Sequence, residues 1–123
     1  MKASKHFKFS EFDCKNGEPV PVEFYDNVKE LAKNLEVVRY YFGKPIIINS
    51  SYRSPEHNKA IGGVSNSQHL KAKASDIVIR GVEPKEVYRA IESLIDRGLM
   101  KQGGLGLYST FVHYDIRGTK ARW

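Results

Sequence analysis

Two histidines and two aspartates in the second half of the chain have spacings that could build a chemical site. His69 ends a polar loop, and Asp76 follows it at the start of an apolar run. His113 and Asp115 are two residues apart in a segment with strand-like alternation, so both point to one face. If the two segments are neighbouring strands, two imidazoles and a carboxylate meet. Two histidines with one acidic residue are a common catalytic zinc set that leaves a fourth position for water.

Each histidine taken singly is better explained as a structural residue, because most buried polar groups simply have a hydrogen-bond partner. The combination favours a site. A carboxylate beside Ile77-Val78-Ile79 is costly to desolvate unless it is paired or bound to a metal. Cys14 is the only cysteine, so an internal disulfide and a cysteine-based zinc site are both excluded. Any metal must therefore be held by histidine and carboxylate.

Arg53 is a second candidate, in the polar segment Ser-Ser-Tyr-Arg-Ser at residues 50–54. It follows a predicted strand, where ligand-contacting residues are common. Its guanidinium could clamp a carboxylate or stabilise a developing oxyanion. The alternative is a surface arginine in an ion pair, which is the default for an isolated arginine.

Periodicity predicts the elements that must position these residues. Apolar residues at steps of three and four indicate helices over residues 23–41 and 84–98, and a short helix is expected at 55–61. Strands are expected at residues 45–49, 76–79, 103–108 and 111–116, the last two joined by a tight turn. This order predicts an α+β fold, with a small, mainly antiparallel sheet flanked by helices.

Length and composition are those of a small globular domain. The 123 residues suit a single domain spanning 1–123, with 41% hydrophobic and 28% charged residues. No apolar run approaches the roughly 20 residues of a membrane span, so membrane insertion is not expected. The basic start, Met1 to His6, is not followed by an apolar stretch, so we expect no signal peptide and synthesis in the cytoplasm.

A series of motifs runs in a fixed order along the chain. It consists of Ser-Tyr-Arg-Ser at 51–54, Ile-Gly-Gly at 61–63, Ser-Gln-His at 67–69, Ala-Ser-Asp at 74–76 and Phe-Val-His-Tyr-Asp at 111–115. Together these motifs resemble the zinc D-Ala-D-Ala carboxypeptidases, and more closely their small branch found in phages and prophages. The resemblance implies the fold shared by the vancomycin-resistance dipeptidases and the hedgehog domain.

The resemblance also implies roles for individual residues. His69 and Asp76 match the first two zinc ligands and His113 matches the third, which implies one Zn²⁺ per chain. Arg53 matches the arginine that holds oxygens of the substrate or transition state. Ser67 matches a polar position beside the first ligand, where we expect substrate contact or support of that ligand. The implied partners are peptidoglycan stem peptides.

Two positions depart from the pattern. Several relatives have an acidic general base three residues before the last histidine ligand, where this chain has Thr110. We expect Asp115 to replace it as the base, with an acceptor that orients an imidazole as the alternative. Relatives often have glycine near Ala72, and we expect this change to alter the shape of the loop and not the identity of the ligands.

The expected function is zinc-dependent hydrolysis of amide bonds in peptidoglycan stem peptides, by a D,D-carboxypeptidase or a murein endopeptidase. Without a signal peptide, such an enzyme would reach the cell wall after release by a phage lysis machinery. The alternative is a non-catalytic, zinc-containing peptidoglycan-binding module, which Thr110 keeps open. A nucleic-acid-binding domain is less favoured. The net charge of +6 is scattered along the chain and does not form a basic cluster.

Overall fold

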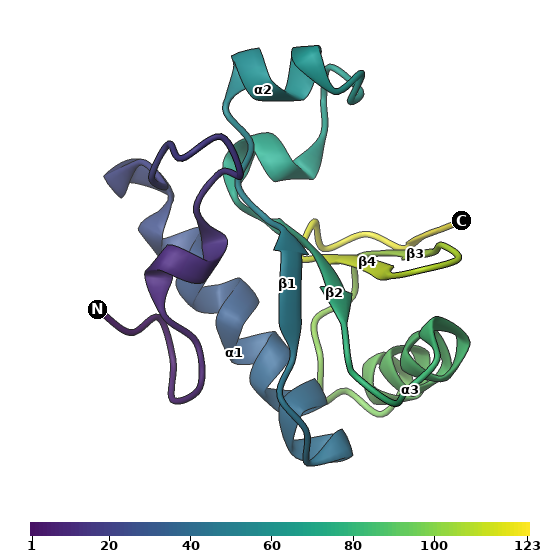
Figure 1. Cartoon of the computed structure of the whole chain (residues 1–123). Coiled ribbons are helices and arrows are strands. Elements are labelled where there is room, and N and C mark those ends of the chain that lie inside the picture. The colour runs from purple at the N-terminus through teal and green to yellow at the C-terminus, as the bar shows by residue number, and fades with distance from the viewer.

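Five short strands form one sheet in the computed structural model, which describes residues 1–123 (Figure 1). The strand order in the sheet is β1-β2-β4-β3-β5, and only the β3–β5 pair is parallel. The fold class is therefore the predicted one, a small α+β fold with a mainly antiparallel sheet. The strands are β1 (Ile47–Ser50), β2 (Ala74–Val78), β3 (Gly104–Leu107), β4 (Val112–Asp115) and β5 (Ala121–Arg122).

The three α-helices form where the sequence patterns indicate. They are α1 (Tyr25–Phe42), α2 (Pro55–Ala60) and α3 (Pro84–Asp96). Helix α1 ends at Gly43, whose φ of 63° is a left-handed conformation that glycine adopts at little cost. Helix α3 begins with Pro84, which suits the first helical turn because proline lacks the N–H that would be unpaired there. None of these helices has the length and apolar character needed to cross a bilayer.

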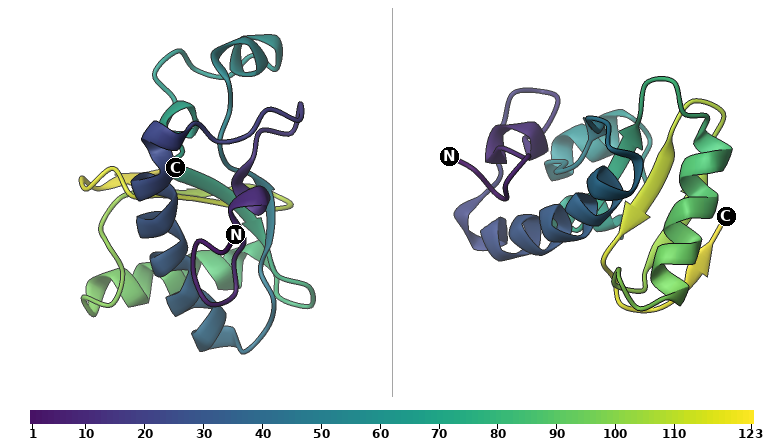
Figure 2. Two further views of the ribbon diagram at one scale, coloured as in Figure 1. Left: turned by 90° about the vertical axis from the view of Figure 1, so that its left-hand side faces the viewer. Right: turned by 90° about the horizontal axis from the view of Figure 1, so that it is seen from below.

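The long helices bury their apolar stripes in a common core. Leu31 and Leu35 of α1 and Ile91 of α3 are fully buried in one cluster with the apolar side of the sheet. Helix α3 packs against β3 and β4, while α1 runs alongside β1 (Figure 1). Helix α2 and its following loop lie at the end of the molecule opposite to α3, as both Figure 1 and the left view of Figure 2 show. Helix α2 therefore lies apart from α3, whereas Lys71, further along the same segment, accepts a hydrogen bond from Asn27 of α1.

Three details differ from the sequence-based expectations. Strand β2 begins at Ala74, so Asp76 lies in the middle of a strand and not at its start. His69 lies in a short 3-10 helix, Gln68–Lys71, where a plain loop was expected. Strand β5 was not predicted, because two residues are too few to carry an alternating pattern. It pairs with β3 through long-range backbone hydrogen bonds.

The two faces of the sheet have different chemistry. Residues paired directly across neighbouring strands share a face, so Asp76 and His113 lie together on one side. Ser75, paired with Tyr114, and Ile77, paired with Val112, lie on the other side and are buried. Strand alternation thus separates a polar face from the apolar core.

Replacing Ser75 by alanine is expected to raise the free energy of unfolding. The Ser75 hydroxyl is completely buried and has no hydrogen-bond partner, so folding removes it from water without compensation. An unpaired buried hydroxyl costs about 1–3 kcal/mol, and the smaller alanine loses little packing, so we expect a gain of about 1 kcal/mol. Urea unfolding of Ser75→Ala and wild type measures this difference. A loss of stability would mean that the hydroxyl is satisfied in solution.

Candidate metal centre

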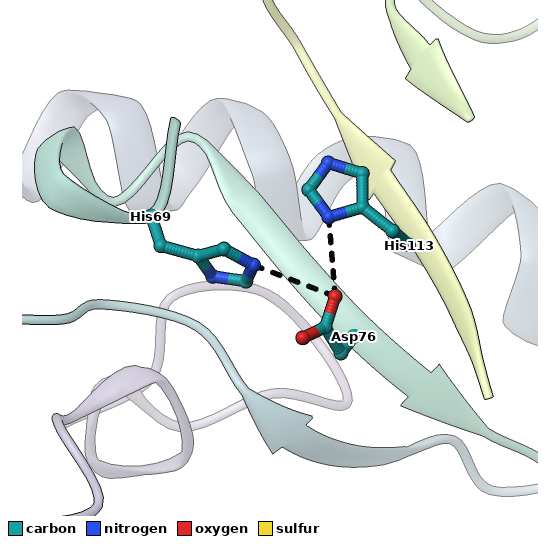
Figure 3. A group of neighbouring side chains, drawn as sticks. All are labelled: His69, Asp76 and His113. Carbon is teal, nitrogen blue, oxygen red and sulfur yellow. Dashed lines mark hydrogen bonds and ion pairs between the residues drawn. The ribbon is translucent and has the colours of Figure 1, made fainter. Parts of the chain in front are cut away.

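His69, Asp76 and His113 meet at one point on the polar face of the sheet (Figure 3). Nδ1 of His113 lies 3.1 Å from Oδ1 of Asp76, and Nε2 of His69 lies 3.4 Å from the same oxygen. The three atoms that could bind a metal all lie within 4.8 Å of one another. Each residue is less than 10% exposed. The structure therefore brings together the three residues that the sequence predicts as ligands.

Local structure around His69 fixes the direction of its ring. Ser67 caps the 3-10 helix, and its Oγ accepts a hydrogen bond from the backbone N–H of His69 at 3.2 Å. Nδ1 of His69 donates to the backbone carbonyl of Ser51 at 2.6 Å. Ala72 ends the turn with a φ of 57°, the left-handed conformation that glycine adopts more easily. The alanine accepts this conformation, and His69 still faces the cluster.

Hydrogen bonds on the far side of each ring determine which nitrogen is free. The Ser51 carbonyl can only accept, so Nδ1 of His69 carries the proton and Nε2 presents a lone pair to Asp76. Nε2 of His113 lies 2.7 Å from Oδ2 of Asp115, and donation to this carboxylate leaves Nδ1 free towards Asp76. Each imidazole is held in one tautomer by a partner outside the cluster, as is common for metal ligands.

The contacts of Asp115 favour an orienting role over that of a general base. Its side chain is completely buried, and both oxygens are occupied. Oδ1 accepts from the backbone N–H groups of Gly104 and Arg117, and Oδ2 accepts from His113. The Arg117 guanidinium adds two hydrogen bonds of 2.9 and 2.8 Å. Asp115 thus lies behind His113 and has no free oxygen on the side where a substrate would react.

The same contacts shift the pKa values of the cluster. Burial acts to raise the pKa of Asp76, but the neighbouring imidazoles of His113 and His69 outweigh burial and hold the pKa well below the usual range. Burial likewise opposes ionisation of Asp115, and the hydrogen bonds from His113 and Arg117 outweigh it and lower its pKa. For His113, burial acts to lower the pKa, yet hydrogen bonds to Asp115 and Asp76 raise it above 6.5.

The donor set fits a zinc ion. In the tautomers described, two nitrogen lone pairs and a carboxylate oxygen converge in a buried space, and three acceptors repel one another unless a cation or a proton lies between them. Two histidines and one carboxylate, with a fourth side open, match the preferences of catalytic zinc. The Ser51 carbonyl and the Asp115 carboxylate accept hydrogen bonds from the two imidazoles and supply the outer support that such sites require.

We expect a rise in pH to destabilise the metal-free protein and to increase the stabilisation that zinc provides. The raised pKa of His113 means that, without metal, its protonation stabilises the fold fully below about pH 6.5, and this contribution is lost as pH rises through the raised pKa. The lowered pKa values of Asp76 and Asp115 give contributions that are lost only when pH falls well below 3.8. Zinc must displace the His113 proton, so its stabilising effect grows with pH.

Thermal unfolding at about pH 6 and about pH 8, with and without zinc, measures both effects. The metal-free protein should melt at a lower temperature at the higher pH, while the increase in melting temperature caused by zinc should be larger there. A zinc-induced increase in melting temperature that is the same at both pH values would contradict the arrangement of protons described.

An open cleft of about 700 Å³ leads to the cluster. Arg53 and Ser67 both line it, as their predicted contact with substrate requires. Arg53 is held by weak contacts of 3.4 Å from its guanidinium to Asp76 and to Asn58. Asn58 in turn donates to the carbonyl of Val64 in the loop after α2. The Asn58 side chain thus links Arg53 to this loop through hydrogen bonds.

Aromatic residues in the cleft were not recognised from the sequence as functional. Tyr108 and Phe111 stack with ring centroids 4.4 Å apart, and the Trp123 ring lies 5.0 Å from that of His113. All three line the cleft. Their types alone are as typical of a core as of a site, so only their exposure in the structure identifies them. Arg117 also lines the cleft, beside Trp123.

The fold and the cluster together define a small α+β protein with a His-Asp-His centre of the kind found in metallopeptidases. The model of the peptidase M15 family matches residues 5–115, which is most of the chain. The protein therefore belongs to the peptidase M15 family, the zinc D-Ala-D-Ala carboxypeptidase type that its motifs resemble. No curated protein matches the chain.

Proposed function

We propose that this protein is a zinc peptidase that hydrolyses amide bonds in peptidoglycan stem peptides, as a D,D-carboxypeptidase or a murein endopeptidase. The observation that carries the proposal is the convergence of His69, Asp76 and His113 at the base of an open cleft in a chain of the M15 family. A zinc ion held there would polarise the scissile carbonyl and activate water.

The residues around the cluster would then bind and orient the peptide. Arg53 presents guanidinium N–H groups beside Asp76, where they could stabilise negative charge on the carbonyl oxygen or hold a substrate carboxylate. Ser67 lies beside His69 at the cleft surface, where its hydroxyl could contact the peptide backbone. Asp115 and the Ser51 carbonyl keep the two imidazoles in the tautomers that present a lone pair to the cluster.

A second candidate, a non-catalytic zinc-containing module that binds peptidoglycan, is favoured by one observation. Asp76 is the only carboxylate that lines the cleft, because Thr110 replaces the acidic residue of relatives and Asp115 is buried behind His113. A peptidase without a free carboxylate base would have to pass the proton by another route.

Metal removal distinguishes the two candidates. For the peptidase, purified peptidoglycan should be cleaved by the zinc-loaded protein, a chelator should abolish the cleavage, and added zinc should restore it. Mass spectrometry of the released fragments would identify the bond. Zinc-dependent binding of peptidoglycan without any fragment would instead support the binding module, and a protein that binds no zinc would exclude both.

A further inference from the structure

The single tryptophan of the chain is held in a defined position next to the metal centre. Trp123 follows β5, and its backbone N–H and carbonyl form hydrogen bonds with Leu105 and Leu107 of β3. Its indole N–H donates to the hydroxyl of Tyr108 at 2.8 Å. The indole ring lies 5.0 Å from the His113 ring, and the Arg117 guanidinium lies 5.5 Å from its centre.

Two further features of the sheet make room for this indole and hold it. Gly106 pairs with His113 in the sheet, and a Cβ at Gly106 would collide with the Trp123 ring, so the missing side chain lets the indole lie across β3. Arg122, the neighbour of Trp123, forms two hydrogen bonds of 2.8 Å with Glu92 of α3. Arg122 is therefore held by α3, and Trp123 is held by β3 and Tyr108.

In spite of these contacts, 47% of Trp123 remains exposed, as does 41% of Tyr108. A large aromatic side chain that is fixed in place and still half exposed loses little conformational freedom when a ligand covers it. Both residues line the cleft that leads to the His-Asp-His cluster. Their exposed surface lies where a bound peptide would pass.

We propose that Trp123 is a specificity-determining residue whose exposed indole surface packs against the apolar part of the substrate residue next to the scissile amide. The inference rests on the proposed function and adds a contact to it. The ring borders His113, so a peptide positioned for attack at the metal centre would cover it. Covering half of a tryptophan removes enough apolar area from water to strengthen binding by about 10-fold or more.

Kinetics of the zinc-loaded protein on soluble muropeptides test this role. Trp123→Ala should raise KM about 10-fold while kcat and the zinc content stay close to wild type. Trp123→Phe keeps a flat ring and should raise KM less. Tyr40→Ala is the matched control, because Tyr40 is an aromatic residue 90% exposed on α1 and outside the cleft, and its KM should not change. An unchanged KM in Trp123→Ala would overturn the inference, and so would a loss of zinc, which would give Trp123 a structural role.

Fluorescence gives a second, independent readout, because Trp123 is the only tryptophan. Titration of the zinc-loaded wild type with muropeptides should shift its emission to shorter wavelength and protect it from acrylamide quenching. Peptide cleavage without any change in emission would exclude the contact. Absence of cleavage would refute the proposed peptidase, whereas saturable fluorescence change in that case would still support peptide binding at Trp123.

Discussion

His69→Ala is expected to abolish zinc binding and peptide hydrolysis together. His69 supplies one of three converging ligand atoms, and alanine leaves only Asp76 and His113. Because changes to the outer partners of metal ligands already cost about 10–100-fold in affinity or activity, loss of a ligand should cost more than about 100-fold in both. Elemental analysis of zinc per chain and hydrolysis of purified peptidoglycan measure the two effects.

His57→Ala is the matched control for this experiment. His57 is a partly exposed histidine in α2 whose ring makes no hydrogen bond and does not line the cleft. The control should bind one zinc and retain wild-type activity, which shows that the loss in His69→Ala is specific to the site. Full activity of His69→Ala would show that the ligand assignment is wrong.

Asp115→Asn should weaken zinc binding by about 10–100-fold and also destabilise the fold. An asparagine side chain has one oxygen where the aspartate has two, so its amide N–H groups must face either the donor nitrogen of His113 or the Arg117 guanidinium. The substitution also removes the charge that pairs with Arg117, and because the Arg117 side chain is 28% exposed and can be solvated, we expect this loss to cost less than the roughly 3–5 kcal/mol of a fully buried pair. Zinc affinity by competition with a chelating dye, and the melting temperature, are the measurements.

This variant separates the two roles considered for Asp115. If Asp115 orients His113, zinc affinity falls. A general base would instead leave zinc affinity unchanged while hydrolysis drops by about 10²–10⁴-fold. Glu92→Gln is a suitable control, since Glu92 also forms a two-point pair with an arginine but lies on α3 away from the cleft. Its zinc affinity should equal that of wild type.

The elements that carry the site were largely predictable because their signals are local. The apolar period of α1 and α3 follows from residues a few positions apart, and glycine or proline marks their ends. Alternation in β4 places His113 and Asp115 on one face whatever the partner strand is. The boundaries differ by a few residues, and β5 was missed because its two residues are specified by pairing with β3.

Residue types and motif order alone predicted which residues form the centre. With Cys14 as the only cysteine, a metal could be held only by histidine and carboxylate, and the order of motifs indicated His69, Asp76 and His113. Residue type and spacing carry this information because they limit which atoms can bind a metal. The pairing of β2 with β4 then brings Asp76 opposite His113, as expected for neighbouring strands.

The contacts of the residues around the centre, in contrast, became visible only in the folded chain. Asp115 shares a strand face with His113, which is compatible with either a base or an orienting acceptor, and its contacts with Arg117 and Gly104 favour the orienting role. Trp123 lies beside His113 because β5 pairs with β3 and Gly106 leaves room for the indole. Such arrangements depend on contacts between residues far apart in the chain, which local residue patterns do not encode.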